Sequence, residues 1–493
     1  MTRYSVAMTG DAHAALRDHL LRPDGQEDVC VATYSVSTGA HRKTAIIRRV
    51  LFPADGERAV HGNASFKGHY VVRAAAEAAG RGEGIALLHS HPGATGWQGL
   101  SGMDYQTESD YFRVAHGYTG LPLVGLTLAG EREEWSARFW NDADAPDWAE
   151  SVRIVDDRLR VSWNDDLRKP PKANRRQVRT VSAWGDERQR SIARLRVLVV
   201  GAGSVGLDVA QRLAATGLID VGSMDFDEVE QVNLDRMIGA TRLDARLGRA
   251  KVRVAERLSK SAATAKRFRF AALEMSITDP AGLSTALDYD VIFSCVDRPW
   301  ARAVLNSIAY SDLVPVIDGG IDLEPFPDGR LRSGIWRAHT LVPGRPCMLC
   351  TRQLNVTDLA LDREGKLDDP EYIRRSGREE PKRQNVAALS AGVSAALLGQ
   401  FVSLVAHPGN LGVPAPLRFM IGPHLLEHLP TASGQFCPYE AELGLGDERT
   451  ILVATQQNWR SIVADRAKRR VPMPLRLLDA AERRVNRAIN GLG

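Results

Sequence analysis

The sequence predicts an α/β protein in two parts, an N-terminal α+β domain followed by a domain built on a parallel sheet. Short β-like runs separated by turns fill the first 140 residues, which is typical of a compact α+β domain. From Arg196 the pattern becomes strand, glycine turn, helix and strand, as in a parallel-sheet unit. With 44% hydrophobic and 25% charged residues in 493, the composition is that of a globular protein of two or three domains.

The first domain, residues 1–150, is predicted from four β-like runs and one helix. Each run is rich in β-branched and aliphatic residues and is bounded by turn-forming residues. The runs lie at 29–36, 44–52, 85–90 and 121–130, and the alanine-rich helix is 70–79.

Three further segments complete the predicted organisation. Residues 151–182 are expected to be a linker, because the stretch 167–180 carries six basic residues and no acidic one. Residues 183–430 form the predicted second domain, which includes a long apolar helix at 385–405. Residues 431–493 are expected to be a C-terminal extension of helix and packing with little chemistry.

Composition excludes several classes of protein. With 64 basic and 60 acidic residues, the formal charge of +4 does not suggest a nucleic-acid partner. The N-terminus lacks an apolar signal core, and no unbroken apolar run of about 18 residues predicts a membrane span. The five scattered cysteines are expected to be reduced thiols in a cytoplasmic protein, not a disulfide scaffold.

Two histidines and an aspartate form the first candidate site. His89 and His91 end an apolar run, and because residues two apart on a strand share a face, both can reach one metal ion. Asp104 follows in a segment where Ser101 is a candidate helix N-cap. Two histidines and a carboxylate are a usual ligand set for catalytic zinc, with a fourth position left for water.

With the proline after His91 and the Ser-x-x-Asp that follows, these residues resemble the JAMM (JAB/MPN) metalloisopeptidase motif. The resemblance implies a glutamate that takes a proton from the water that zinc activates. Glu27 matches that glutamate, and Asp28, the next residue, is the alternative. Ser101 would stabilise the oxyanion of the tetrahedral intermediate. The loop before this serine, which holds Trp97 and Gln98, is about two residues longer than in the family.

A glycine-rich turn forms the second candidate site. Gly201, Gly203 and Gly206 lie directly between a predicted strand and a predicted helix, where glycines allow close approach of a phosphate to the helix N-terminus. Asp225 is placed to bind a ribose. These residues alone fit an NAD-dependent dehydrogenase and an ATP-using enzyme equally well.

The residues that follow decide between the two. They resemble the signature of ThiF-type adenylyltransferases and ubiquitin-activating enzymes, and the resemblance covers about residues 180–405. It implies a Rossmann-like fold, ATP and Mg²⁺, with basic side chains on the polyphosphate. The matching residues are Asp225, Asp227, Asn233, Leu234, Arg236, Gly248, Lys251 and, after an apolar strand, Asp297 as the partner of Mg²⁺.

The match has departures and one open choice. Met237 stands where the family has a glutamine, and Arg298 where it has an asparagine; neither change removes a phosphate ligand. The family also supplies an arginine from the segment before the first strand. Arg179 and Arg188 both fit that role.

The cysteines raise two further questions. ThiF-type proteins pair a CxxC such as Cys347 and Cys350 with a second CxxC to hold a structural zinc, but here only Cys437 of the second pair remains and Glu440 replaces its partner. The site is therefore either completed by Glu440 or a histidine, or lost.

The loop expected to carry a catalytic cysteine has none. Either Cys347 or Cys350 serves as nucleophile, or the adenylate passes directly to another protein. Cys30 and Cys295 lie in apolar strands and are expected in the core.

Together the two resemblances imply a bifunctional enzyme of a ubiquitin-like modification pathway. It would adenylate the C-terminal glycine of a ubiquitin-like protein and use zinc to cut after that glycine. A separate conjugating enzyme and a homodimer are expected. One alternative is activation of a sulfur-carrier protein for thiamine or molybdopterin-type synthesis, and another is a non-catalytic scaffold that binds the modifier.

Overall fold

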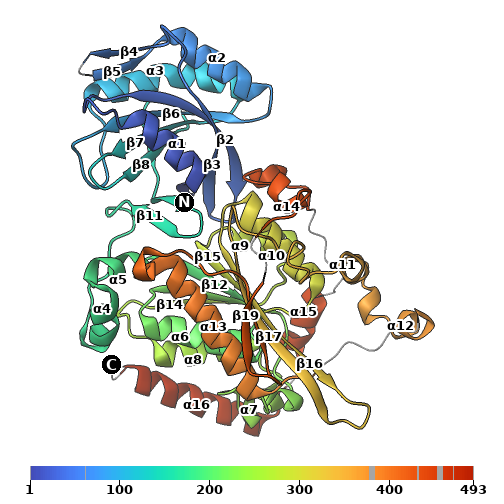
Figure 1. Cartoon of the computed structure of the whole chain (residues 1–493). Coiled ribbons are helices and arrows are strands. Elements are labelled where there is room, and N and C mark those ends of the chain that lie inside the picture. Colours follow the sequence, from blue (N-terminus) through green and yellow to red (C-terminus); the bar gives the residue numbers. More distant parts are fainter. Residues whose placement is uncertain are drawn as a thin grey trace. The chain divides into compact units, whose positions relative to one another are not determined.

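The computed structural model describes residues 2–61, 63–376, 384–429, 432–451, 459–469 and 471–491. They form two compact units, each built from segments that are not contiguous in the sequence (Figure 1). The first unit comprises Met1–Pro170, Tyr310–Leu313 and Pro438–Thr450, and the second comprises Pro171–Ala309, Val314–Cys437 and Ile451–Gly493.

The first unit is built on a mixed nine-stranded sheet. The strand order is β11-β10-β1-β3-β2-β6-β7-β8-β9, with parallel pairs β1/β10, β1/β3 and β6/β7. The elements are β1 (Arg3–Thr9), α1 (Gly10–Leu20), β2 (Val29–Thr38), β3 (Arg42–Leu51), β4 (Arg58–His61), β5 (Asn63–Phe66), α2 (Gly68–Ala79), β6 (Gly84–His91), α3 (Gly102–Thr119), β7 (Leu123–Ala129), β8 (Glu134–Trp140), β9 (Asp147–Trp148), β10 (Ser151–Val155), β11 (Leu159–Trp163) and α14 (Pro438–Ala441).

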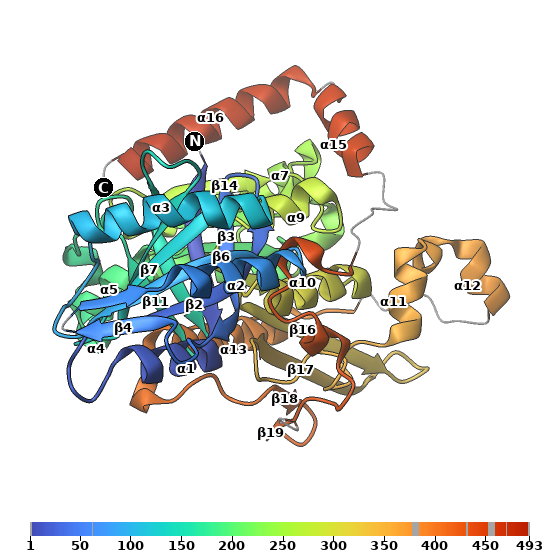
Figure 2. The ribbon, with the colours of Figure 1, turned by 90° about the horizontal axis from the view of Figure 1, so that it is seen from above.

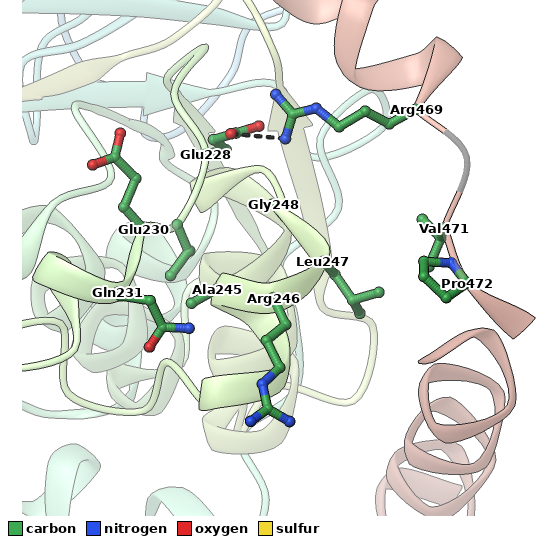
Figure 3. Close-up of a pocket in the computed structure, with 11 residues that line it drawn as sticks. Glu228, Glu230, Gln231, Ala245, Arg246, Leu247, Gly248, Arg469, Val471 and Pro472 are labelled. Atoms are coloured by element: carbon green, nitrogen blue, oxygen red, sulfur yellow. Dashed lines mark hydrogen bonds and ion pairs between the residues drawn. The ribbon is translucent and has the colours of Figure 1, made fainter. Parts of the chain in front are cut away.

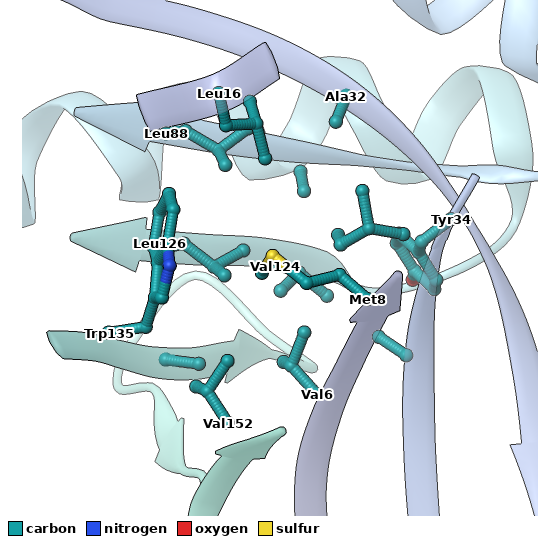
Figure 4. Packing of buried hydrophobic residues seen from close by; sticks show 14 of the residues in the cluster. Val6, Met8, Leu16, Ala32, Tyr34, Leu88, Val124, Leu126, Trp135 and Val152 are labelled. Carbon is teal, nitrogen blue, oxygen red and sulfur yellow. The ribbon is translucent and has the colours of Figure 1, made fainter. Parts of the chain in front are cut away.

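The alternation of side chains along the central strands divides the core of this unit into two layers. On β2, Cys30 and Ala32 pack in the same layer as Leu16 of α1, and Val31 between them packs in the layer of α2 and α3. Figure 4 shows the first layer, with Met8 and Trp135 among its members. The sheet is therefore buried on both faces, as expected for strands that read as nearly continuous apolar runs.

The predicted runs of the first domain correspond to β2, β3, β6 and β7, and the predicted helix corresponds to α2. The expected linker needs correction, because its first residues form β10 and β11, and β10 pairs in parallel with β1. Arg153 lies in β10 and is fully buried. Because Arg153 interrupts the apolar pattern of this five-residue strand, the sequence pattern does not predict it.

The second unit contains an eight-stranded sheet in the order β14-β13-β12-β15-β16-β17-β18-β19, parallel from β14 to β16 and antiparallel beyond. Its elements are α4 (Val178–Trp184), α5 (Asp186–Ala193), β12 (Arg196–Val200), α6 (Ser204–Thr216), β13 (Asp220–Met224), α7 (Arg242–Leu247), α8 (Lys251–Ala262), β14 (Arg269–Leu273), α9 (Pro280–Ala286), β15 (Val291–Ser294), α10 (Pro299–Ser311), β16 (Val316–Pro325), β17 (Leu331–Leu341), α11 (Val356–Arg363), α12 (Pro370–Ser376), α13 (Ala387–Ala406), β18 (Leu417–Met420), β19 (Leu425–His428), α15 (Trp459–Lys468) and α16 (Met473–Gly491).

Helix α13 is, within the described ranges, the one helix long and apolar enough to cross a membrane. The sequence analysis predicted no such helix, because it found no unbroken apolar run of about 18 residues. In this structure α13 packs against α6, β16 and β17, and Val393, Leu397 and Phe401 are buried. It therefore serves as a core helix of the second unit.

The C-terminal extension does not behave as one segment. Residues 438–450 belong to the first unit, where the hydroxyl of Thr38 bonds Asp447 at 2.6 Å. Helices α15 and α16 belong to the second unit, and α16 packs on α7 and α8. The expectation of one extension is corrected by this division, and the expected helices and packing are present.

One glycine tests the packing of the first unit. A Cβ on Gly125 of β7 would overlap the buried carboxylate of Glu108 on α3. We expect Gly125→Ala to lower the free energy of unfolding of this unit by about 1–3 kcal/mol, measured by urea denaturation. Gly117→Ala on the same helix is the control, because a Cβ there meets nothing within 4 Å and alanine favours the helix. Equal stability of the two variants would contradict this packing.

Candidate functional site

The first candidate site lies where β6 ends and α3 begins. The ligand atoms of His89, His91 and Asp104 lie within 4.8 Å of one another, and the rings of the two histidines are 5.0 Å apart between centroids. His89 Nε2 is 3.8 Å from Asp104 Oδ1. The strand and helix thus bring together the three predicted zinc ligands.

The surroundings suit these side chains for metal binding. Burial, together with the nearby Arg138, lowers the pKa of His89 to about 3, so the imidazole is neutral as a ligand must be. Gln98 Oε1 lies 3.1 Å from His91 Nδ1, and when Nδ1 donates that hydrogen bond, Nε2 is left for a metal. Gln98 lies in the lengthened loop, and sequence reasoning gave it no role.

Asp104 divides its two carboxylate oxygens between two tasks. Oδ2 accepts a hydrogen bond from the Ser101 N–H at 3.0 Å, and the Ser101 hydroxyl accepts one from the Asp104 N–H at 3.2 Å. Ser101 is therefore the N-cap of α3, as the sequence predicts. Oδ1 is the oxygen that faces His89. The oxyanion role of Ser101 remains a prediction.

The pairing of β2 with β6 separates Glu27 from Asp28. Val29 lies opposite His89 in this antiparallel pair, and the register continues with the Ser90 N–H donating to the Asp28 carbonyl. Glu27 therefore lies on the face of His91. Its carboxyl is partly buried, which raises its pKa, and it senses the charges of His91 and Asp104.

Asp28 has a structural role instead. It is almost fully buried and forms ion pairs with Arg58 and, at 3.4 Å, with Arg22. These two contacts engage the Asp28 carboxylate away from the metal ligands. Of the two candidates for the base, the geometry favours Glu27.

A buried ion pair fixes the helix that carries Asp104. Glu108, one turn further along α3, binds the fully buried Arg138 of β8 through both carboxylate oxygens and accepts a bond from Trp140 Nε1 at 2.7 Å. Arg138 also donates to the Thr127 hydroxyl at 2.7 Å, which lies 3.3 Å from His89 Nε2. This chain of polar contacts orients Asp104 and His89 together.

The second candidate site is the turn between β12 and α6. Gly201 has a φ of +93°, and a Cβ there would lie 2.5 Å from the carbonyl oxygen of Cys295. A Cβ on Gly206 would overlap the Gly201 carbonyl, but one on Gly203 would meet nothing within 4 Å. The first and third glycines therefore allow close packing, and the second leaves open space at the helix N-terminus where a phosphate can bind.

Asp225 joins this turn to the next strand. Its carboxylate accepts hydrogen bonds from the Ala202 N–H at 2.7 Å and the Asp227 N–H at 2.8 Å. Burial raises the pKa of Asp225. Lys251 Nζ lies 2.8 Å from Asp227 Oδ2, and against desolvation the charges of Asp225, Asp227 and Asp297 raise the pKa of Lys251.

The other predicted ligands are placed less closely. Asn233 is buried and uses its side-chain oxygen to cap its own turn, accepting from the Glu230 N–H at 3.0 Å. Arg236 bonds the Val232 carbonyl at 2.6 Å and Asp235 at 2.9 Å, both in its own loop. These contacts do not bring Arg236 and Lys251 together on one phosphate position, as the sequence analysis expects.

The choice between the two arginines from the segment before β12 stays open. Arg179 on α4 and Arg188 on α5 are both exposed. Arg188 lies 3.1 Å from a ring nitrogen of His407, a contact that says nothing of a nucleotide.

Three cysteines gather at a third position. The Cys347 sulfur lies 3.5 Å from that of Cys350 and 3.4 Å from that of Cys437. Burial raises the pKa of Cys347. At Cys350 burial is outweighed by hydrogen bonds from the Gly434 N–H and the neighbouring thiols, so its pKa is lowered. The donor set fits zinc, and no fourth His, Asp or Glu joins the group among the residues that the structure describes.

The two cysteines expected in the core differ in position. Cys30 lies in β2 and is buried, and burial raises its pKa to about 12. Cys295 directly follows β15 and is only partly buried, so the expectation of a core strand position is wrong for this residue; desolvation raises the pKa of its thiol.

Comparison with known proteins identifies the domain that contains the glycine turn. Residues 174–407 match the ThiF family. Over 169 residues, or 34% of this chain, the sequence is 29% identical to the molybdopterin-synthase adenylyltransferase of Escherichia coli and covers 62% of that protein. It is 32% identical over 137 residues to the sulfur carrier protein adenylyltransferase of Thermus thermophilus, covering 28% of this chain and 49% of the relative.

The chain thus spans less than two thirds of the length of these relatives. The solved structure of E. coli MccB with ATP aligns with 54% of this chain and 74% of that chain, at 17% identity and a TM-score of 0.41. The ThiF-family domain contains all the residues of the predicted nucleotide site. The match does not extend to the metal cluster of the first unit, so the JAMM resemblance stays a prediction.

The metal site gives a direct prediction. The wild-type chain should hold about one zinc at the histidine cluster, and His89→Ala/His91→Ala should lose it because two of the three ligands are removed. Mass spectrometry of the metal in purified protein measures this. His69→Ala/His116→Ala, which removes two exposed histidines, should keep that zinc.

Any zinc that remains in the first variant reports on Cys347, Cys350 and Cys437. Full retention of metal by His89→Ala/His91→Ala, with Cys347→Ser/Cys350→Ser metal-free, would show that the histidine cluster binds none.

Proposed function

We propose that the ThiF-family domain adenylates the C-terminal carboxylate of a small carrier protein, using ATP and Mg²⁺. The observation that carries the proposal is the group formed by Asp225, Asp227 and Lys251 beside the glycine turn. These contacts bring a carboxylate and a lysine close to the helix N-terminus, which supports a role for them in binding ribose and phosphate. The relatives named for adenylyl transfer support the same reaction class.

The reaction assigns a step to each of these groups. A carboxylate oxygen of the carrier attacks the α-phosphorus of ATP, the bond to the bridging oxygen breaks, and pyrophosphate leaves with the electron pair. Negative charge grows on the phosphates as pyrophosphate departs, and Lys251 and the N–H groups of α6 stabilise it. Asp225 would hold the ribose, and Asp297 would hold Mg²⁺, whose charge assists the departure of pyrophosphate.

The names of the relatives favour a sulfur-carrier protein over a conjugated modifier as the substrate. The two relatives are a molybdopterin-synthase adenylyltransferase and a sulfur carrier protein adenylyltransferase. We therefore place sulfur-carrier activation first and ubiquitin-like conjugation second. A separate conjugating enzyme is expected only if the substrate is a conjugated ubiquitin-like modifier. The homodimer is expected from the family resemblance.

A second function is supported by the metal cluster of the first unit. His89, His91 and Asp104 are arranged as a three-ligand site, and Glu27, two residues before β2, lies close enough for His91 and Asp104 to affect its pKa. Zinc there would activate water for attack on a peptide bond. Glu27 would accept the proton and return it to the leaving amine. Trimming the carrier to its C-terminal glycine is the step that this hydrolysis would serve.

Pyrophosphate exchange tests the first function. Given ATP, Mg²⁺ and a carrier protein that ends in glycine, the enzyme should incorporate labelled pyrophosphate into ATP. Asp297→Ala should reduce the rate by about 100-fold or more, because the metal loses a ligand beside the leaving group. Asp328→Ala, which removes an exposed aspartate paired with Arg330, should leave it unchanged.

Exchange with a free amino acid, or without any carrier, would overturn the proposed substrate class. Binding of the carrier without exchange or cleavage would favour the scaffold alternative.

Cleavage of an extended carrier tests the second function. Glu27→Gln should keep its zinc and lose cleavage of residues placed after the glycine, because the amide cannot accept a proton. It should also keep exchange with the mature carrier. Chromatography of the reaction products at equal zinc content measures both. If Asp28→Asn loses cleavage and Glu27→Gln does not, the base has been assigned to the wrong residue.

A further inference from the structure

The C-terminal segment outside the ThiF match contacts the candidate nucleotide site. The match ends at residue 407, but α15 and α16 belong to the same unit as the glycine turn. Figure 2 shows α16 beside α7, on which it packs. The loop that α15 and α16 contact runs from Phe226 to Arg249.

Arg466 on α15 makes the most direct of these contacts. Its side chain is only 11% exposed, and its Nη2 donates to the carbonyl oxygen of Phe226 at 2.5 Å. The same guanidinium donates to Glu274 at 3.0 Å and to Glu228 at 3.4 Å. Two acceptors from the loop after β13 and one from the residue after β14 thus converge on one arginine, whose planar fork suits such an arrangement.

The carbonyl group that Arg466 contacts belongs to the turn that carries the two candidate carboxylates. Phe226 lies between Asp225 and Asp227, the two carboxylates of the candidate site. Two backbone groups on either side of it bond within the ThiF-family domain, since the Asp225 N–H donates to the Leu273 carbonyl and the Asp227 carbonyl accepts from the Lys251 N–H. Arg466 supplies the donor for the Phe226 carbonyl from outside the family match.

A second arginine extends the same attachment. Arg469 Nη1 donates to Glu228 at 2.8 Å, drawn as a dashed line in Figure 3 at the rim of a pocket of about 320 Å³. A Cβ on Gly248 would lie 2.5 Å from Arg469 Nη1, so the glycine of the G-x-x-K motif leaves room for this side chain. Glu228 also forms a β-bridge with Ala250, next to Lys251.

Helix α16 holds the far end of the loop. Arg249 bonds Asp479 at 2.7 Å and Glu482 at 3.1 Å, and Arg257 bonds Glu482 at 2.9 Å. Both arginines also bind the fully buried Asp244. Charges of both signs alternate in this network. Such a network stabilises the attachment of α16 more than one exposed ion pair would.

We propose that α15 and α16 form a strap that holds the nucleotide-binding loop, and that Arg466 is a positioning residue for ATP. The inference rests on the proposed function, because it assigns Asp225 and Asp227 to the nucleotide. The contacts of Arg466 are with Phe226, Glu228 and Glu274, so its proposed role is to position other residues. It acts by fixing the peptide between the two carboxylates, so that Asp225 faces the ribose and Asp227 stays beside Lys251.

The experiment compares four forms of the full chain: wild type, Arg466→Met, Arg466→Lys and Lys468→Ala. Methionine keeps the apolar stem and removes the donors, and lysine keeps the charge with fewer directed donors. Lys468 is exposed on the same helix and serves as the matched control. Equilibrium binding of Mg·ATP by calorimetry, pyrophosphate exchange kinetics and the thermal unfolding midpoint are measured for each form.

Loss of a charge-assisted hydrogen bond predicts weaker ATP binding and a higher KM for ATP in Arg466→Met, each by about 10- to 100-fold. The kcat at saturating ATP should stay within about threefold, since the chemistry is untouched. Arg466→Lys should recover part of the affinity, and Lys468→Ala should match wild type.

Wild-type affinity and KM in Arg466→Met would overturn the proposal. So would a fall in kcat with unchanged KM, or a loss of affinity in Arg466→Lys as large as in Arg466→Met with both unfolding midpoints lowered. If the wild type binds ATP but shows no exchange with a carrier, the proposed function fails, and the binding comparison still decides the role of Arg466.

Discussion

The nucleotide-binding half of this protein depends on the hydrogen bonds of one carboxylate. Asp225 accepts the Ala202 N–H from the glycine turn and the Asp227 N–H from its own loop, so a single side chain connects the ends of two neighbouring parallel strands. Close packing at Gly201 and Gly206 brings α6 near enough for the connection. The polar chemistry of the site, including the placement of Lys251, follows from this junction.

The metal cluster depends on a different constraint, the register of two antiparallel strands. Because Val29 pairs with His89, Glu27 and His91 fall on one face and Asp28 and Ser90 on the other. A shift of one residue would exchange the faces and place Asp28 beside the metal ligands. The buried Glu108–Arg138 pair then holds α3 so that Asp104 completes the group.

Sequence patterns were sufficient for the elements with a strong local signature. The Ser101 cap, the glycine turn and the His-x-His strand end are short motifs whose geometry is set by neighbours in the chain. Sequence patterns did not predict the features that depend on contacts between residues far apart in the chain. The pattern predicts a linker where β10 lies, because this strand contains the buried Arg153. The contact of Gln98 with His91 depends on the fold of the loop between them. The side-chain and carbonyl partners of Arg466 are more than 190 residues away in sequence. The choice between Glu27 and Asp28 needed the β2–β6 register, which no local pattern contains.

The proposed function requires that the ThiF-family domain form an acyl-adenylate on a carrier protein. Hydroxylamine captures such an intermediate, because its nitrogen attacks the activated carbonyl and AMP leaves. Mass spectrometry of the carrier after incubation with enzyme, ATP, Mg²⁺ and hydroxylamine therefore detects adenylate formation directly. We expect a hydroxamate at the C-terminal glycine that requires both ATP and enzyme. If the enzyme binds ATP and carrier and yet leaves the C-terminal carboxylate unmodified, the proposed adenylation is wrong.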